Sequence, residues 1–239
     1  MVFIKKYRHK PIYKKFVNLK SNVQNRQKLF KFKKNKWKNL LFRLSLNSKF
    51  KKRNCYYKFY DQNSYVVLKF SNYFSRKYSE NILDKRGFKL YYGGLSKKYL
   101  KNVVAKSVKK SNNLNNSIKS NLFFGSFIEQ RLDIILVKSN FVLSVRNARQ
   151  LINHGHVLVN NRVIKNNSFL IKAGDKITLR NKVHNLIQYY ILKSLFWPLP
   201  PSYLQVSYSN LQIRLVDNVL ISNSINTNLN LATVLKLYQ

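Results

Sequence analysis

The segment from Ser144 to Leu179 changes its hydrophobic period from helical to alternating within a few residues. Ala148, Leu151 and Ile152 recur at helical spacing, and Ser144 is a residue type that commonly caps a helix N-terminus. Gly155 stands where the left-handed residue that ends a helix is expected. The pattern therefore predicts a helix that passes almost directly into a small sheet.

Short strands and tight turns are predicted after this helix. Val157 and Val159 alternate with their neighbours, and residues 160–161, both Asn, can form a turn with positive φ before the chain returns through 162–164. A second turn at 174–175 precedes a closing strand through 177–179. We expect a helix pair packed on an antiparallel hairpin sheet.

Charge restricts the partners of such a chain. Lys and Arg total 46 against seven Asp and Glu, a formal net charge of +39. Self-repulsion of this size opposes compaction, whereas a polyanionic partner such as nucleic acid would offset it. Residues 131–180 contain nine basic and two acidic residues, and residues 183–239 contain three and one. No apolar run approaches the roughly 20 residues needed to cross a bilayer, so we expect no membrane span.

The N-terminal region is the most basic part of the chain. Residues 1–60 contain 20 Lys and Arg and no acid, with aromatic residues such as Phe30, Phe32 and Trp37 between them. A solvated tail and a transit peptide are alternatives, but a tail has no need of aromatic residues and transit peptides are Arg- and Ser-rich. We interpret the region as an arm that becomes ordered on RNA.

Helices are expected between this arm and the central segment. Ser96 is a candidate N-cap, and Tyr99, Leu100, Val103 and Val104 after it form one apolar face, with lysines largely off that face. A polar loop at 111–121 separates this helix from a second helical stretch that starts at Phe123.

The central residues resemble an RNA-binding module named after the fourth protein of the small ribosomal subunit. The resemblance is carried by Arg-Leu-Asp at 131–133, Ala-Arg-Gln-Leu at 148–151, His154, the run Val157, Val159 and Asn160, Arg162-Val163, and Gly174-Asp175. Asn161 replaces the usual Gly, and Asn is the next best residue at positive φ. The flanks, with LDKRGFKLYYGGLS before the module and PPSYLQV after it, are similar to the ribosomal protein itself, as is the final TVLKLYQ, expected to be a strand.

The resemblance implies an α+β fold, in which a small RNA-binding module with a helix pair and a small antiparallel sheet is inserted in a mainly helical domain. The expected parts are a basic N-terminal extension (1–78), the first part of the helical domain (79–130), the module (131–182), and a C-terminal part (183–239) that packs back on the helical domain. Leu195, Phe196 and Trp197 are core or protein-contact candidates there.

The function implied by the resemblance is that of a structural protein of the small ribosomal subunit. Members of the family bind the five-prime domain of small-subunit rRNA, nucleate assembly and line the side at which mRNA enters. The implied partners are this rRNA, neighbouring small-subunit proteins and mRNA. An AT-rich codon bias is indicated by abundant Asn, Lys, Ile, Phe and Tyr. Together with the divergent N-terminal region and the lack of a clear import signal, it favours a mitochondrial origin, with a plastid or an AT-rich bacterium as the alternatives.

The residues expected to bind rRNA are polar or basic residues of the module and of the preceding helical region. They are Tyr92, Lys97, Lys98, Lys101, Arg131, Lys138, Ser144, Arg146, Arg149, Gln150, Asn153, His154, His156, Asn160, Arg162 and Lys165. Arg146, Arg149, Gln150 and Asn153 are expected on the outer face of the module's second helix, with Leu151 and Ile152 inside.

No catalytic, cofactor or metal site is expected. Asp133 lies at the start of a predicted helix, where an Asp usually interacts with the helix dipole or with an Arg. His154 and His156 have no Cys or acid close by in sequence, and Cys55, the single cysteine, excludes an internal disulfide. An RNA-modifying enzyme of the pseudouridine synthase type, which carries the same module, is the alternative; it would need a catalytic domain within residues 1–120.

Overall fold

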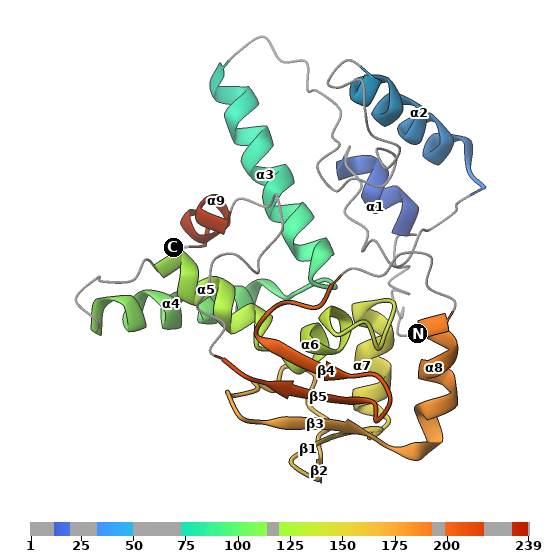
Figure 1. The fold of residues 1–239 in the computed structure, drawn as a ribbon. Coiled ribbons are helices and arrows are strands. Elements are labelled where there is room, and N and C mark those ends of the chain that lie inside the picture. The colour runs from blue at the N-terminus through green and yellow to red at the C-terminus, as the bar shows by residue number, and fades with distance from the viewer. Residues whose placement is uncertain are drawn as a thin grey trace, which may run out of the picture. The chain divides into compact units, whose positions relative to one another are not determined.

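The computed structural model describes residues 12–19, 33–49, 73–113, 120–192, 199–217 and 231–238 of the 239-residue chain (Figure 1). The expectations for Phe30, Phe32, Cys55 and residues 195–197 fall outside these ranges. The chain divides into two compact units, and the boundary lies within helix α3, between Leu83 and Asp84. Among the described residues, no helix combines the length and the apolar content needed to cross a bilayer.

The first unit contains two helices within the predicted N-terminal extension, α1 (Ile12–Leu19) and α2 (Asn35–Lys49). Phe16 and Leu19 of α1 and Trp37 and Leu40 of α2 are buried, and the rings of Phe16 and Trp37 lie 6.0 Å apart. Two of the aromatic residues in the basic run therefore contact each other within the protein. The expectation of an arm that becomes ordered on RNA did not include this contact.

A helical core forms the first part of the second unit. Helix α3 spans Tyr73–Tyr91 and begins earlier than the predicted boundary at residue 79; α4 spans Lys97–Asn113 and α5 spans Ser120–Glu129. The Oγ of Ser96 accepts a hydrogen bond from the backbone N–H of Tyr99 at 3.2 Å, which confirms the predicted cap. The buried side chains of this core include Phe88, Tyr92, Leu100, Val104, Phe124 and Ile128.

The helical stretch predicted from Phe123 is two helices. The α-helical run stops at Glu129, and α6 (Leu132–Lys138) starts after Arg131, which forms an isolated β-bridge with Leu170. The backbone N–H of Leu132 donates to the carbonyl of Phe169, so a tertiary contact replaces an intrahelical hydrogen bond at this break. Local periodicity continued across the break and could not reveal it.

The predicted local signals of the module are confirmed. Helix α7 spans Val145–Asn153, and the Oγ of Ser144 accepts a hydrogen bond from the backbone N–H of Asn147. Gly155 has φ +71°, and the turn residues Asn160 and Asn161 have φ of 49° and 65°. The turn joins strand β1 (Val157–Val159) to β2 (Arg162–Val163), and β3 (Lys176–Leu179) pairs with β1 on its other side.

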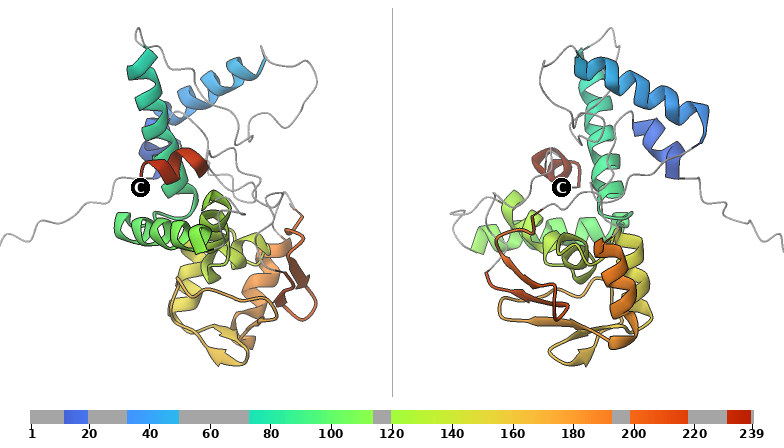
Figure 2. Two further views of the ribbon diagram at one scale, coloured as in Figure 1. Left: turned by 90° about the vertical axis from the view of Figure 1, so that its left-hand side faces the viewer. Right: turned by 45° about the vertical axis from the view of Figure 1, so that its right-hand side comes forward.

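The sheet is larger than the small sheet predicted for the module. Strands β4 (Leu204–Ser207) and β5 (Gln212–Leu215) form a hairpin whose β5 pairs antiparallel with β3, giving the order β2-β1-β3-β5-β4. Alternate residues, including Val157, Ile177 and Ile213, are buried against α6, α7 and α8 (His184–Leu192), and their neighbours lie on the open, polar face. Figures 1 and 2 show these helices beside the sheet.

Two expectations for the C-terminal part are corrected. Residues 184–192 and 203–215 join the core of the module, and α9 (Leu231–Lys236) packs back on the helical core. The described C-terminal residues predicted to form a final strand instead form this helix and the turn after it. Val234, Leu235 and Tyr238 are buried together, a spacing of i, i+1 and i+4 that places them on one helical face.

Candidate nucleic-acid interface

A buried carboxylate organises the start of the module. The side chain of Asp133, in the first turn of α6, is 0% exposed. Nε and Nη2 of Arg131 donate to its two oxygens at 2.9 and 2.8 Å, and Nε of Arg149 donates to Oδ2 at 2.8 Å. Because three charge-assisted hydrogen bonds compensate its burial, Asp133 is a structural ion-pair partner, which confirms that part of the sequence interpretation.

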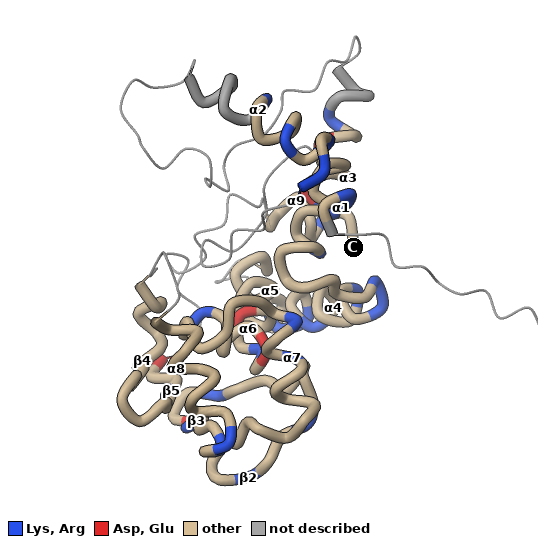
Figure 3. Tube along the Cα trace, turned by 90° about the vertical axis from the view of Figure 1, so that its right-hand side faces the viewer, with Lys and Arg blue, Asp and Glu red and all other residues tan. Residues whose placement is uncertain are grey.

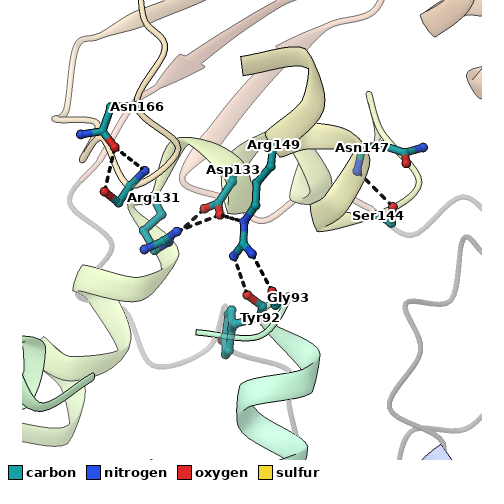
Figure 4. Close-up of polar contacts among 9 residues, drawn as sticks. Tyr92, Gly93, Arg131, Asp133, Ser144, Asn147, Arg149 and Asn166 are labelled. Carbon is teal, nitrogen blue, oxygen red and sulfur yellow. Dashed lines mark hydrogen bonds and ion pairs between the residues drawn. The ribbon is translucent and has the colours of Figure 1, made fainter. Parts of the chain in front are cut away.

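The same arginine joins the module to the end of α3. Nη1 of Arg149 donates to the carbonyl of Gly93 at 2.6 Å, and Nη2 donates to the carbonyl of Tyr92 at 3.1 Å (Figure 4). These carbonyls follow the last turn of α3, where intrahelical partners are lacking. We call this set of contacts from Arg149 to Asp133, Gly93 and Tyr92 the arginine clamp.

The clamp requires a close approach of two backbones. Gly93 has φ +73°, and a Cβ at this position would lie 2.6 Å from Cγ1 of Val145, the first residue of α7. Gly94 also has positive φ, but no atom lies within 4 Å of the place where its Cβ would be. The two glycines therefore have different roles. Both allow the turn after α3, and Gly93 also allows the close contact with Val145 of the module.

A second buried carboxylate, Glu129, was not singled out from the sequence. It accepts hydrogen bonds from the hydroxyls of Tyr92 at 2.7 Å and Tyr203 at 3.2 Å, and Nζ of Lys138 lies 3.7 Å from it. Burial, and then the Glu129 charge, raise the pKa of Tyr92 and Tyr203 well above the usual range. Burial alone would lower the pKa of Lys138, but interactions with Glu129 and Tyr91 together outweigh burial and raise the pKa. Glu129 thus links α3, α5, α6 and the β4–β5 hairpin.

These two networks include four of the residues predicted to contact RNA. Tyr92 is 1% exposed and Arg131 is 4% exposed, so neither side chain reaches the surface. The guanidinium of Arg131 lies over the Tyr99 ring at 4.7 Å as well as against Asp133. Arg149 does not project freely with Arg146, because all its guanidinium nitrogens donate within the chain. Lys138 has only 18% of its side chain exposed.

The turn residue Asn160 also has a structural role. Its Nδ2 donates to Asp175 at 2.8 Å, and its Oδ1 accepts from the backbone N–H of Lys176 at 2.9 Å. Asp175 in turn accepts from the backbone N–H of Lys172. This pairing of the two predicted turns fixes the hairpin, and it engages the amide that had been expected to meet RNA.

The remaining predicted residues are at the surface or at a rim, in three groups. The outer face of α7 and the residues after it contribute Arg146, Gln150, Asn153, His154 and the half-buried His156, with Ser144 half-buried at the helix start. The β1–β2 hairpin and the residues after it contribute Arg162 and Lys165, and the start of α4 contributes Lys97, Lys98 and Lys101. Figure 3 shows Lys and Arg positions along α4 and at the hairpin end of the sheet, with acidic positions beside α6 and α7 between them.

The second unit has five acids, and two of them are turned inward. Glu129 and Asp133 are fully buried, Asp84 and Asp175 are half-buried, and Asp217 is exposed. The burial of Glu129 and Asp133 reduces the negative charge at the surface of this unit, whereas the basic side chains of α4, α7 and the hairpin remain exposed. In the described ranges, no three His, Cys, Asp or Glu side chains are grouped as metal ligands would be.

Residues 130–177 match the family model of the S4 domain. The chain is similar to proteins named small ribosomal subunit protein uS4, and this similarity confirms the predicted resemblance. It is 33% identical to small ribosomal subunit protein uS4m of Reclinomonas americana over 135 residues, 54% of this chain and 51% of that protein.

Bacterial relatives match over similar spans. Small ribosomal subunit protein uS4 of Ehrlichia canis is 39% identical over 99 residues, 41% of this chain and 46% of that protein. The uS4 of Mesomycoplasma hyopneumoniae is 34% identical over 138 residues, 57% of this chain and 64% of that protein. The matched region thus spans about half the length of these relatives, and a mitochondrial form is among them.

Proposed function

We propose that the chain is a structural protein of the small ribosomal subunit that binds the five-prime domain of small-subunit rRNA. The relatives named uS4 and the S4 domain support the ribosomal role. The observation that carries rRNA binding is the separation of charge in the second unit: Glu129 and Asp133 are buried in internal networks, while the basic residues of α4, α7 and the hairpin are exposed. Such a surface attracts phosphates.

The proposed rRNA-contacting residues are those at the surface or rim that take no part in the contacts of Asp133, Glu129 or Asn160 described above. They are Lys97, Lys98, Lys101, Ser144, Arg146, Gln150, Asn153, His154, His156, Arg162 and Lys165. Tyr92, Arg131, Lys138, Arg149 and Asn160 act by holding this surface in shape. The other proposed partners are neighbouring small-subunit proteins and mRNA, and the proposed roles are nucleation of assembly and lining the side at which mRNA enters.

We propose a mitochondrial location, supported by the uS4m relative, and a non-enzymatic role. The non-enzymatic proposal is supported by the two buried acids: hydrogen bonds to Arg131, Arg149, Tyr92 and Tyr203 engage the carboxylates that a catalytic pocket would need free. A modification assay on rRNA bound to the full chain tests it. Formation of pseudouridine would contradict the structural role.

Binding of the full chain to transcribed five-prime-domain rRNA tests the main proposal. A large-subunit rRNA fragment of equal length, in the presence of excess tRNA, is the matched competitor. The proposal predicts a clear preference for the small-subunit RNA at physiological salt. Equal affinity for the two RNAs would indicate non-specific electrostatic binding and would contradict the proposal.

A further inference from the structure

A pocket of about 240 Å³ opens between α7 and α8, which lie side by side in both Figure 1 and Figure 2. Its apolar floor comes from Val142, Leu151 and Val183. Drug-sized ligands occupy roughly 300–1,000 Å³, so this volume suits one planar ring system. Its walls are formed by five polar or aromatic residues and one aliphatic residue, Leu186. The five are Asn147, Gln150, His154, His156 and Tyr190.

None of the lining residues is a Lys, Arg, Asp or Glu. The pocket therefore does not suit a phosphate, although the chain around it is strongly basic. Arg146 is exposed on the first turn of α7, and the backbone N–H of Arg180, another exposed residue, donates to the carbonyl of His156 at 3.0 Å. A neutral, ring-sized pocket with cations at its edge fits a nucleotide whose base enters and whose phosphate stays outside.

The walls offer both interactions that bind an unstacked base. The rings of His154 and His156 are stacked, with centroids 6.1 Å apart, and Tyr190 provides a third ring. Asn147 and Gln150 each carry an amide donor and acceptor, and in the described part of the chain neither amide has a hydrogen-bond partner. Nδ1 of His156 is buried and likewise lacks a partner among the described residues. Specific RNA recognition relies on such stacking and edge contacts to splayed bases.

We propose that this pocket binds a single unstacked nucleobase of the rRNA. The inference rests on the proposed function and names the chemical group that this part of the surface takes. A side chain of a neighbouring protein is the competing occupant. The absence of charge and the free amides favour the base, because bases present matched donors and acceptors on a planar ring.

The test uses the double variant Asn147→Ala with Gln150→Ala in the full chain, bound to five-prime-domain rRNA at several salt concentrations. The matched control is Asn185→Ala with Gln188→Ala, which removes two amides from exposed positions of α8 outside the pocket. The pocket variant should bind about tenfold more weakly at every salt concentration, because the hydrogen bonds from two amides to the base edge are lost while the stacking rings remain. The slope of log K against log salt should not change, since no charge is removed.

A second readout needs no variant. Ultraviolet cross-linking of the wild-type complex, followed by mass spectrometry, should place a nucleotide adduct on Tyr190, His154 or His156. Pocket and control variants that bind equally, or a protein adduct at these residues in purified subunits, would overturn the pocket proposal alone. Failure of the wild-type chain to prefer small-subunit rRNA would instead overturn the proposed function.

Discussion

Replacing Arg149 tests the arginine clamp. Arg149→Ala removes hydrogen bonds to Asp133, Gly93 and Tyr92. A hydrogen bond to a charged group contributes about 1.5–3 kcal/mol. Asp133 keeps both bonds from Arg131, so its charge stays compensated and the full penalty of an unpaired buried ion does not arise. Arg149 is part-buried, so water can replace some of the lost bonds. We expect the free energy of unfolding to fall by about 3 kcal/mol, which is less than the sum of the three bonds.

Arg146→Ala is the control, because Arg146 lies three residues away on α7 and is exposed. It should change the free energy of unfolding by less than about 0.5 kcal/mol. Arg149→Lys should behave more like the Ala variant, since one ammonium cannot reproduce three directed bonds from a planar fork.

Urea unfolding followed by circular dichroism measures these differences, and native-state hydrogen exchange at the amides of α7 and at Gly94 locates them. Only the Arg149 variants should lose protection there. The opposite contrast is expected in rRNA binding, where Arg146→Ala should reduce the salt slope by about 1. Equal small effects of Arg146→Ala and Arg149→Ala on stability, with equal losses of rRNA binding, would refute the clamp.

Three further predictions follow from the same contacts and charges. Gly93→Ala should lower the free energy of unfolding by about 2–4 kcal/mol, because the alanine backbone would be strained at positive φ and its Cβ would lie 2.6 Å from Val145. Gly94→Ala carries only the φ strain and should lower it by about 1 kcal/mol. Thermal unfolding compares the two variants, and equal costs would contradict the close approach at Gly93. Because the pKa of Tyr203 is raised in the folded protein, its hydroxyl ionises first in the unfolded chain. The buried neutral hydroxyl therefore contributes fully to the stability of the fold below pH about 10, and progressively less as the pH rises above it. Tyr203→Phe should reduce the fall in unfolding free energy above that pH by about 1.4 kcal/mol per pH unit, and an unchanged fall would argue against this burial. Affinity for small-subunit rRNA should drop on the order of 10³- to 10⁵-fold between 50 and 200 mM salt if six to ten phosphates are contacted, and a nearly flat response in a filter-binding titration would contradict the charged surface.

Local features of the fold were predictable from the sequence because short-range physics determines them. Ser96 and Ser144 cap helices through bonds three residues away, and Gly155, Asn160 and Asn161 adopt the positive φ that their types allow. The fold class followed from the change in hydrophobic period and the resemblance. These signals require no knowledge of what packs where.

Tertiary contacts decided what the sequence could not. Arg146 and Arg149 are separated by about one turn of α7 and share a broad helix face. The tertiary positions of Asp133 and of the Tyr92 and Gly93 carbonyls distinguish them. The break at Arg131 depends on Leu170, a bridge partner far along the chain. The C-terminal helix was predictable in principle, since the spacing of Val234, Leu235 and Tyr238 is helical, but the expected strand took precedence.

The role of Glu129 had a weak signal. It is one of only seven acids, and it stands in an otherwise apolar run at the end of α5. An acid in that setting needs buried partners. Its partners, Tyr92, Lys138 and Tyr203, come from separate elements, so their identity required the fold.

Cross-linking of the chain within purified small ribosomal subunits tests the central claim most directly. The chain should sediment with the small subunit, and RNA adducts should fall on exposed residues such as Arg146, His154, Arg162 and Lys97, joined to nucleotides of the five-prime domain. Buried Tyr92 and Arg131 should carry none. A chain absent from the small subunit, or adducts that avoid α7 and the hairpin, would contradict the account.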